Sequence, residues 1–128
     1  MANPNITSVS SIYAGNFGWK LTASLATLMT VSADKIVKIN SILAANVDAT
    51  ATLDLQVSGM GTGAADGVTP TSSNADIYIA KSISVPAGST ISVIDKPIYL
   101  KENDVLKGNG SVADDIDLFI SFEVIDDA

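Results

Sequence analysis

The sequence contains no cysteine, no histidine and no arginine, and all seven of its basic residues are lysines. Without cysteine, neither a disulfide framework nor a thiolate metal site can form. Without histidine and arginine, the chain lacks the commonest general base, the commonest metal ligand and the bidentate clamp for phosphate. We therefore predict a protein that is not an enzyme and that holds no cofactor and no metal ion.

Positive charge and long apolar runs are also scarce. The formal net charge is -7, which argues against nucleic acid and against anionic membranes, because both bind proteins largely through cationic side chains. No apolar run approaches the roughly 20 residues of a membrane-spanning helix. Residues 1–5 lack the charged and apolar regions of a signal peptide. We predict no nucleic-acid or membrane partner, and a protein made and assembled in the cytoplasm.

The strongest strand signal lies near the end of the sequence, in residues 116–125. Apolar side chains occupy every second position there, which is typical of a strand with one buried face; they are Ile116, Leu118, Ile120, Phe122 and Val124. Shorter β-type runs at 77–85, 90–94 and 98–100 precede it, separated by turn residues at 85–89 and 101–104. We predict that residues 76–125 form an antiparallel meander.

The first half of the sequence adds further strands. A weak candidate at 6–13 predicts either a first strand or, within residues 1–16, an arm that orders only on a partner. Residues 21–31 fit a helix or a strand, and their threonines favour a strand. Residues 36–45 resemble a buried central strand, and 50–57 a half-buried one. The whole predicts a single all-β domain over residues 1–128, an antiparallel sandwich of about eight strands that is jelly-roll-like.

Two stretches are candidate partner-binding sites. In the first, glycines bracket an aromatic residue just before the single tryptophan; large aromatics usually pack in a core, but they also anchor interfaces. Its candidate contact residues are Tyr13, Phe17 and Trp19. The second is the Gly-rich stretch 59–75, which predicts either a solvated hairpin tip or a contact loop. Its candidate contact residues are Met60, Val68 and Pro70.

Other motifs carry less chemistry. The glycines at 59–63 lack the Gly-Lys-Ser/Thr and the helix of a phosphate-binding loop. Asp114, Asp115 and Asp117 lie close enough in sequence to suggest calcium, but the EF-hand order of acidic residues is absent. We interpret these aspartates as a solvated acidic rim.

Three segments of strand and turn residues lie at 35–48, 79–90 and 98–107, and an Asp-rich final strand follows them. In these segments and this strand, the sequence resembles the small virion structural proteins of tailed bacteriophages, especially cyanophage-type ones. The resemblance covers residues 36 to the end. It implies a β-sandwich, often jelly-roll-like, that oligomerises and binds capsid, neck or tail surfaces. It implies no active site.

From this resemblance we expect a homotrimer that acts as a capsid decoration or cement protein on the lattice of the major capsid protein in the virion. A neck, collar or tail component is the alternative within the same class. A carbohydrate-binding module is the alternative from another class, and it would use Tyr13, Trp19, Tyr78 or Tyr99 as stacking platforms. If Trp19 is a contact residue, Trp19→Ala should weaken particle binding more than folding.

Overall fold

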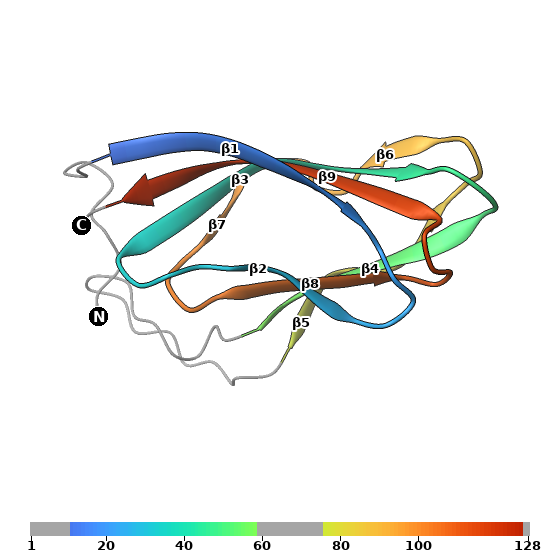
Figure 1. Cartoon of the computed structure of the whole chain (residues 1–128), viewed down its shortest axis with the longest axis horizontal. Helices are drawn as coiled ribbons and strands as arrows, with labels where there is room; N and C mark the ends of the chain where they lie inside the picture. The colour runs from blue at the N-terminus through green and yellow to red at the C-terminus, as the bar shows by residue number, and fades with distance from the viewer. Residues whose placement is uncertain (1–10, 59–75, 127–128) are drawn as a thin grey trace.

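The computed structural model describes residues 11–58 and 76–126, and these residues form strands in two layers (Figure 1). In chain order the nine strands are β1 (Ser11–Lys20), β2 (Ala26–Thr30), β3 (Lys35–Asn46), β4 (Ala51–Ser58), β5 (Ile77–Val85), β6 (Thr90–Ser92), β7 (Ile98–Leu100), β8 (Val105–Gly110) and β9 (Ile116–Asp126). In the described part of the chain, no helix is long and apolar enough to cross a membrane.

The two sheets have jelly-roll connectivity. One sheet has the order β1-β9-β3-β6, with β7 also pairing β3, and the other has the order β2-β8-β4-β5. β6 and β7 pair different halves of β3, so the two short strands together occupy one strand position of the sheet, which we call a lane. Most connections cross from one sheet to the other, which is the arrangement of a double Greek key. The predicted jelly-roll-like antiparallel sandwich is therefore confirmed, with nine strands in eight lanes.

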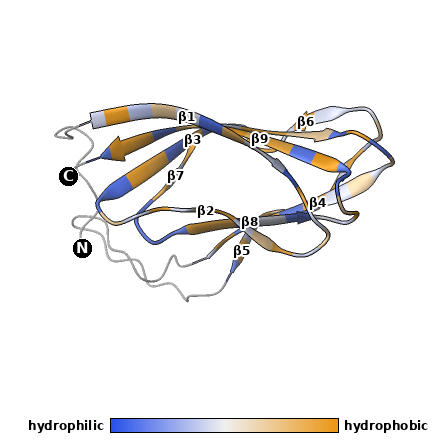
Figure 2. Cartoon of the chain, in the orientation of Figure 1, coloured by the Kyte–Doolittle hydropathy of each residue, from blue (hydrophilic) through white to orange (hydrophobic). Residues whose placement is uncertain are grey.

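The core lies between the inner faces of the two sheets. In β9 the predicted alternation holds over residues 116–120, where Ile116, Leu118 and Ile120 are fully buried. Phe122 and Val124 are only half-buried, and Ile125 on the opposite face is buried. Figure 2 shows the alternation as orange and blue bands along β9. Leu53 and Leu55 of β4 face the three fully buried residues of β9 from the other sheet and are also fully buried. Each buried side chain of this size stabilises the fold by roughly 1.5–3 kcal/mol.

The predicted meander over residues 76–125 is wrong. β5 pairs β4, β6 and β7 pair β3, β8 lies between β2 and β4, and β9 lies between β1 and β3. Each of these strands has the alternation or apolar character that the sequence shows. Alternation determines which face of a strand is buried, but it does not determine which other strand it pairs with. The pairing follows the Greek-key path, in which all partners of β5 to β9 come from the first half of the chain.

Two further expectations for strands need correction. β8 was missed, because two glycines and an asparagine in Val105–Gly110 resemble a loop. β4 was expected to be half-buried, yet Gln56 and Ser58 on its outward side are also buried.

Of the two alternatives for the beginning of the chain, the described residues follow the first strand and not the arm. Residues 11–16 belong to β1, which extends beyond the predicted end at residue 13, through the glycines, to Lys20; residues 1–10 lie outside the described residues. Of the expected strand 21–31, only Ala26–Thr30 is a strand. Leu21 is fully buried in the connection that precedes it.

Candidate interaction surfaces

The predicted aromatic residues of β1 lie on a regular edge strand. Phe17 and Trp19 are half-buried against the core, and their ring centroids are 6.4 Å apart in an edge-to-face arrangement. Phe17 also meets Phe122 of β9 at a centroid distance of 6.1 Å. Tyr13 lies farther along the strand and is 58% exposed. The structure thus gives Phe17 and Trp19 a packing role and leaves Tyr13 accessible.

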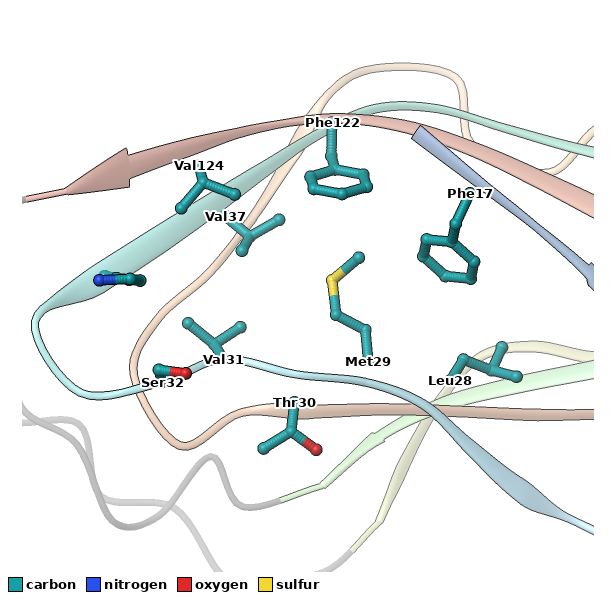
Figure 3. Close-up of a pocket in the computed structure, with 10 residues that line it drawn as sticks. Phe17, Leu28, Met29, Thr30, Val31, Ser32, Val37, Phe122 and Val124 are labelled. Carbon is teal, nitrogen blue, oxygen red and sulfur yellow. The ribbon is translucent and has the colours of Figure 1, made fainter. Parts of the chain in front are cut away.

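An apolar slot lies between the sheets where β1 and β2 form their edges (Figure 3). Its volume is about 430 Å³. Figure 3 shows Phe17 and Phe122 on the upper side and Met29 reaching toward them from β2 below. Hydrophobic side chains form most of its wall, and the full lining is Phe17, Leu28, Met29, Thr30, Val31, Ser32, Lys35, Val37, Phe122 and Val124. We call it the inter-sheet slot.

A second apolar depression lies on the outer face of the β1-β9-β3-β6 sheet. Phe119 of β9 is 44% exposed and Leu43 of β3 is 38% exposed. They occupy one cross-strand row with Gly18 of β1, and a Cβ added at Gly18 would meet nothing closer than 3.9 Å. These three residues, which we call the outer-face patch, line a depression of about 430 Å³ together with Trp19.

An ion pair borders the outer-face patch. The Lys20 ammonium lies 2.6 Å from Asp117 Oδ1, and this hydrogen bond is the main reason why the pKa of Lys20 is raised above its ordinary value of 10.5. The pair occupies the row next to that of Phe119. The outer-face patch is therefore an apolar centre with a charged border, as in many protein interfaces.

Sequence reasoning missed Phe119 and Leu43. A signal for Phe119 was present, because it is an aromatic residue among Asp117, Ser121 and Glu123 on the polar face of the predicted strand. An out-of-phase apolar residue in an alternating strand is expected to be exposed, and it becomes a candidate contact residue where other exposed apolar side chains lie beside it. Leu43 offered no such signal, since β3 has apolar residues on both sides.

The edge strand β5 exposes a third set of apolar side chains, each between 37% and 48% exposed; they are Ile77, Tyr78, Ile79 and Ile83. Lys81 folds back onto its own sheet, with its ammonium 3.2 Å from Asp54 Oδ2 and 4.6 Å from the ring centroid of Tyr78. The hydrogen bond with Asp54 is the main cause of the raised pKa of Lys81.

The tyrosines proposed as a carbohydrate platform do not form one. Tyr13 and Tyr99 lie on β1 and β7, at opposite edges of one sheet, and Tyr78 lies on β5 in the other sheet. Trp19 is half-buried on the same strand as Tyr13. A stacking platform needs rings side by side, so this arrangement does not favour the carbohydrate-binding alternative.

The predicted acidic rim is only partly solvated. Asp114 is exposed and Asp117 half-buried, whereas Asp115 is buried. Glu102 and Asp104 are buried as well. Glu102 accepts a hydrogen bond from the Asp34 amide at 3.0 Å, and Asp104 binds the Lys101 ammonium at 2.9 Å. These carboxylates hold turns together. Among residues 11–58 and 76–126, no group of three acidic side chains could hold a metal ion.

The remaining sequence candidates, Met60, Val68 and Pro70, lie outside the described residues. Of the described candidates, Phe17 lines the inter-sheet slot, Trp19 borders the depression of the outer-face patch, and Tyr13 belongs to neither surface. Both surfaces include residues of β1.

No protein-family model matches this sequence, and no curated protein matches it either. Solved structures with a similar fold include one of Bacillus endospore appendages, described as disulfide-linked pili, at 17% identity and a TM-score of 0.50, covering 92% of this chain and 88% of that chain. They also include the VP2 subviral particle of infectious bursal disease virus, at 13% identity and a TM-score of 0.47.

A third similar structure is the Drosophila NLP core, at 18% identity and a TM-score of 0.44, covering 91% of this chain and 99% of that chain. The alignment with the viral protein covers 90% of this chain but only 32% of that chain. At these identities the likeness concerns the fold alone.

Proposed function

We propose that this chain is a non-enzymatic structural protein of a tailed-phage particle, namely a capsid decoration or cement protein that binds the major capsid protein lattice as a homotrimer. The observation that carries the proposal is the outer-face patch. Phe119 and Leu43 are large apolar side chains that remain exposed in the middle of a sheet face, beside an ion pair. Exposed apolar patches with polar borders commonly mark protein interaction sites.

The fold suits a protein that is used in many copies. A two-layer β-sandwich presents a stiff face, and a patch fixed on such a face needs no ordering when it binds. A trimer would present three outer-face patches to three equivalent lattice sites. Weak single contacts then add up through effective concentration, so a small patch is sufficient.

The first test is the copy number of this chain in purified particles of its source, measured by quantitative mass spectrometry against the major capsid protein. Copies on the scale of the whole lattice support decoration. Copies on the scale of one ring overturn decoration in favour of a neck, collar or tail component. Absence from the particle overturns the virion proposal.

The second test uses the outer-face patch itself. We expect Phe119→Ala to lower particle binding by at least about tenfold, because exposed aromatic anchors dominate interface energies. Its melting temperature should change little, since the Phe119 side chain is 44% exposed. Tyr99→Ala is the matched control, because Tyr99 is an exposed aromatic of the same sheet. Equal binding by both variants contradicts a role for the patch.

Trp19→Ala separates the two roles of that residue. Trp19 borders the depression of the outer-face patch from within β1, but its side chain alternates to the inner face of the sheet, where it packs beside Phe17 against the core. A loss of binding that greatly exceeds the loss of stability supports the contact role. A large drop in the melting temperature of the isolated protein shows that Trp19 is mainly a core residue.

A further inference from the structure

Four lanes lie at the edges of the two sheets, and three of them carry features that hinder pairing with another chain. β2 has five residues and a register shift between Thr27 and Met29. The β6 and β7 lane consists of two three-residue strands. β5 has two register shifts, and Ser82 at its centre has a φ of 52°.

β1 is different, because nothing in its ten residues blunts its edge. It pairs β9 over ten consecutive positions without a register shift. It contains no proline, and Lys20 at its end is its single charged residue. The Lys20 ammonium is held by Asp117 at 2.6 Å. Among the described strands, β9 is the only neighbour of β1. A long, regular, nearly uncharged edge is the kind that accepts another strand.

The register identifies the backbone groups that face outward. Leu21, which follows β1 directly, donates its N–H to the carbonyl of Ile116 at 2.9 Å. In a regular antiparallel pair, alternate residues direct their backbone groups to the same neighbour. The odd-numbered residues of β1 therefore face β9. The outward N–H and C=O groups belong to Ile12, Ala14, Asn16, Gly18 and Lys20.

We propose that β1 pairs with β1 of a second copy of this chain, antiparallel, about a twofold axis at Asn16. In this register Ala14 faces Gly18 of the other copy through outward backbone groups. On the inner face, each Tyr13 faces the other copy's Trp19, and each Gly15 faces the other copy's Phe17. Aromatic pairs and aromatic residues over glycine are favourable cross-strand neighbours.

The axis also avoids charge repulsion. Lys20 faces the uncharged Ile12 of the other copy, and the two Asn16 side chains meet at the axis, where amides can hydrogen-bond to each other. Asn16 is exposed, so a partner can approach it.

The inter-sheet slot supplies a second, independent observation. It lies along the same β1-β2 edge and is lined by Phe17, Leu28 and Met29. A second copy paired on β1 places its own Phe17 and Tyr13 beside this slot. Strand pairing alone buries less than the roughly 1,200 Å² of a stable interface. The slot supplies additional apolar area, and the result is a reversible contact between copies.

This contact forms between copies of the isolated protein, without a particle. Its test is therefore independent of the capsid proposal. The contact joins the β1-β9-β3-β6 sheets of two copies into one sheet of twice the width. We expect sedimentation equilibrium of the full chain to show a mass that rises with concentration. The mass doubles if the smaller species is one chain, and rises at least twofold if it is a trimer, because a trimer carries three β1 edges. A mass that stays constant up to millimolar concentration overturns the proposal.

Charge at the axis tests the site. Asn16→Lys places two ammonium groups opposite each other, and we expect it to weaken the association at least about tenfold. Ser84→Lys, on the exposed edge strand β5, is the matched control and should associate like the parent. Mixing Asn16→Lys with Asn16→Glu should restore the association. If Ser84→Lys weakens the association and Asn16→Lys does not, the contact lies on β5 and the proposal is overturned.

Cysteine substitutions test the register, because the natural chain has no cysteine to interfere. Asn16→Cys should form a disulfide-linked dimer under mild oxidation, since the two Cα atoms of a directly opposed hydrogen-bonded pair lie about 5.5 Å apart, which a disulfide can span. Ala14→Cys alone should not form this dimer, because residue 14 faces Gly18 of the other copy. A mixture of Ala14→Cys and Gly18→Cys should form it. Melting temperatures confirm that each variant is folded. Cross-linking of Ala14→Cys alone, or of none of these, contradicts the register.

Discussion

Asn46 shows how one side chain can join several turns. Its amide Nδ2 donates to the carbonyls of Ala49 and Val85, both at 2.6 Å, and its Oδ1 accepts from the Asp48 amide at 2.9 Å. Its backbone N–H donates to Ser89 at 2.9 Å. Asn46 is buried, so these groups have little access to water.

We therefore predict that Asn46→Leu destabilises the protein by about 3–5 kcal/mol, because it leaves three backbone groups without partners at roughly 1–3 kcal/mol each. Urea denaturation measures the effect. Asn109→Leu is the control, since the Asn109 amide makes only 3.3 Å contacts and should cost less than about 1 kcal/mol. Equal losses for the two variants would contradict the role of Asn46 as a junction.

Gly108 of β8 has no room for a side chain. A Cβ there would lie 2.6 Å from Leu55 Cδ2 and 3.1 Å from both Leu28 Cδ1 and the Asp54 carbonyl. We predict that Gly108→Ala costs about 1–3 kcal/mol through overpacking. Gly18→Ala has its nearest contact at 3.9 Å and should leave the free energy of unfolding nearly unchanged. Denaturation curves for the two variants decide this, and a neutral Gly108→Ala would show that the Leu55 and Leu28 side chains of the neighbouring strands can move aside.

At the scale of elements, the bulge in β5 depends on Asp54 of β4. Asp54 Oδ1 accepts the Ser82 N–H at 2.7 Å, and Oδ2 lies 3.2 Å from the Lys81 ammonium. The carboxylate thus holds Ser82 at its positive φ of 52°. We predict that Asp54→Ala costs about 1 kcal/mol through the lost amide partner. Asp54→Asn keeps an acceptor for Ser82 and should cost less; the reverse order would assign the effect to the ion pair.

The ion pair between Lys81 and Asp54 should also affect how the free energy of unfolding depends on pH. The pKa of Lys81 is raised by its hydrogen bond with Asp54. Its contribution is therefore fully present below the ordinary value of 10.5 and is lost as pH rises through the raised pKa. Compared with Asp54→Asn, the parent should lose additional stability in that alkaline range.

Strands could be predicted from the sequence where apolar residues and the turn residues beside them mark the strand. The bounds of β5 and β7 agree with expectation, and β9 extends one residue beyond it. β8 was missed because its glycines serve packing between Leu28 and Leu55, a demand that only the folded neighbours create. Phe17 and Trp19 were identified as candidates, but their packing role could not be predicted, because Phe17 packs against Phe122, a residue distant in sequence, and Trp19 packs beside Phe17.

At the scale of the whole molecule, the jelly-roll topology joins distant parts of the chain. β1 pairs β9, and β4 pairs β8. Strand alternation in the sequence is the same for a meander and for a Greek key, which is why the fold class could be predicted and the pairing could not.

This topology predicts slow folding. Non-local strand pairs form only after the entropy of closing long loops is lost, and all-β sandwiches of this kind fold in milliseconds to seconds. We expect stopped-flow refolding, followed by Trp19 fluorescence, to give a rate of roughly 1–1,000 s⁻¹. A microsecond phase that recovers the full signal would contradict the assigned strand pairing.

The antiparallel pairing of β1 with β9 also has a mechanical consequence. Ser11 lies opposite Asp126 at one end of the pair, and Lys20 lies opposite Asp117 at the other. A force that pulls residues 11 and 126 apart therefore loads the hydrogen bonds of the ladder one after another, beginning at that end. Such a ladder unzips at low force, whereas a load applied along the strands must shear many bonds at once. A fold with this pairing therefore resists tension best when the load runs along β1 and β9, and least when it is applied between residues 11 and 126.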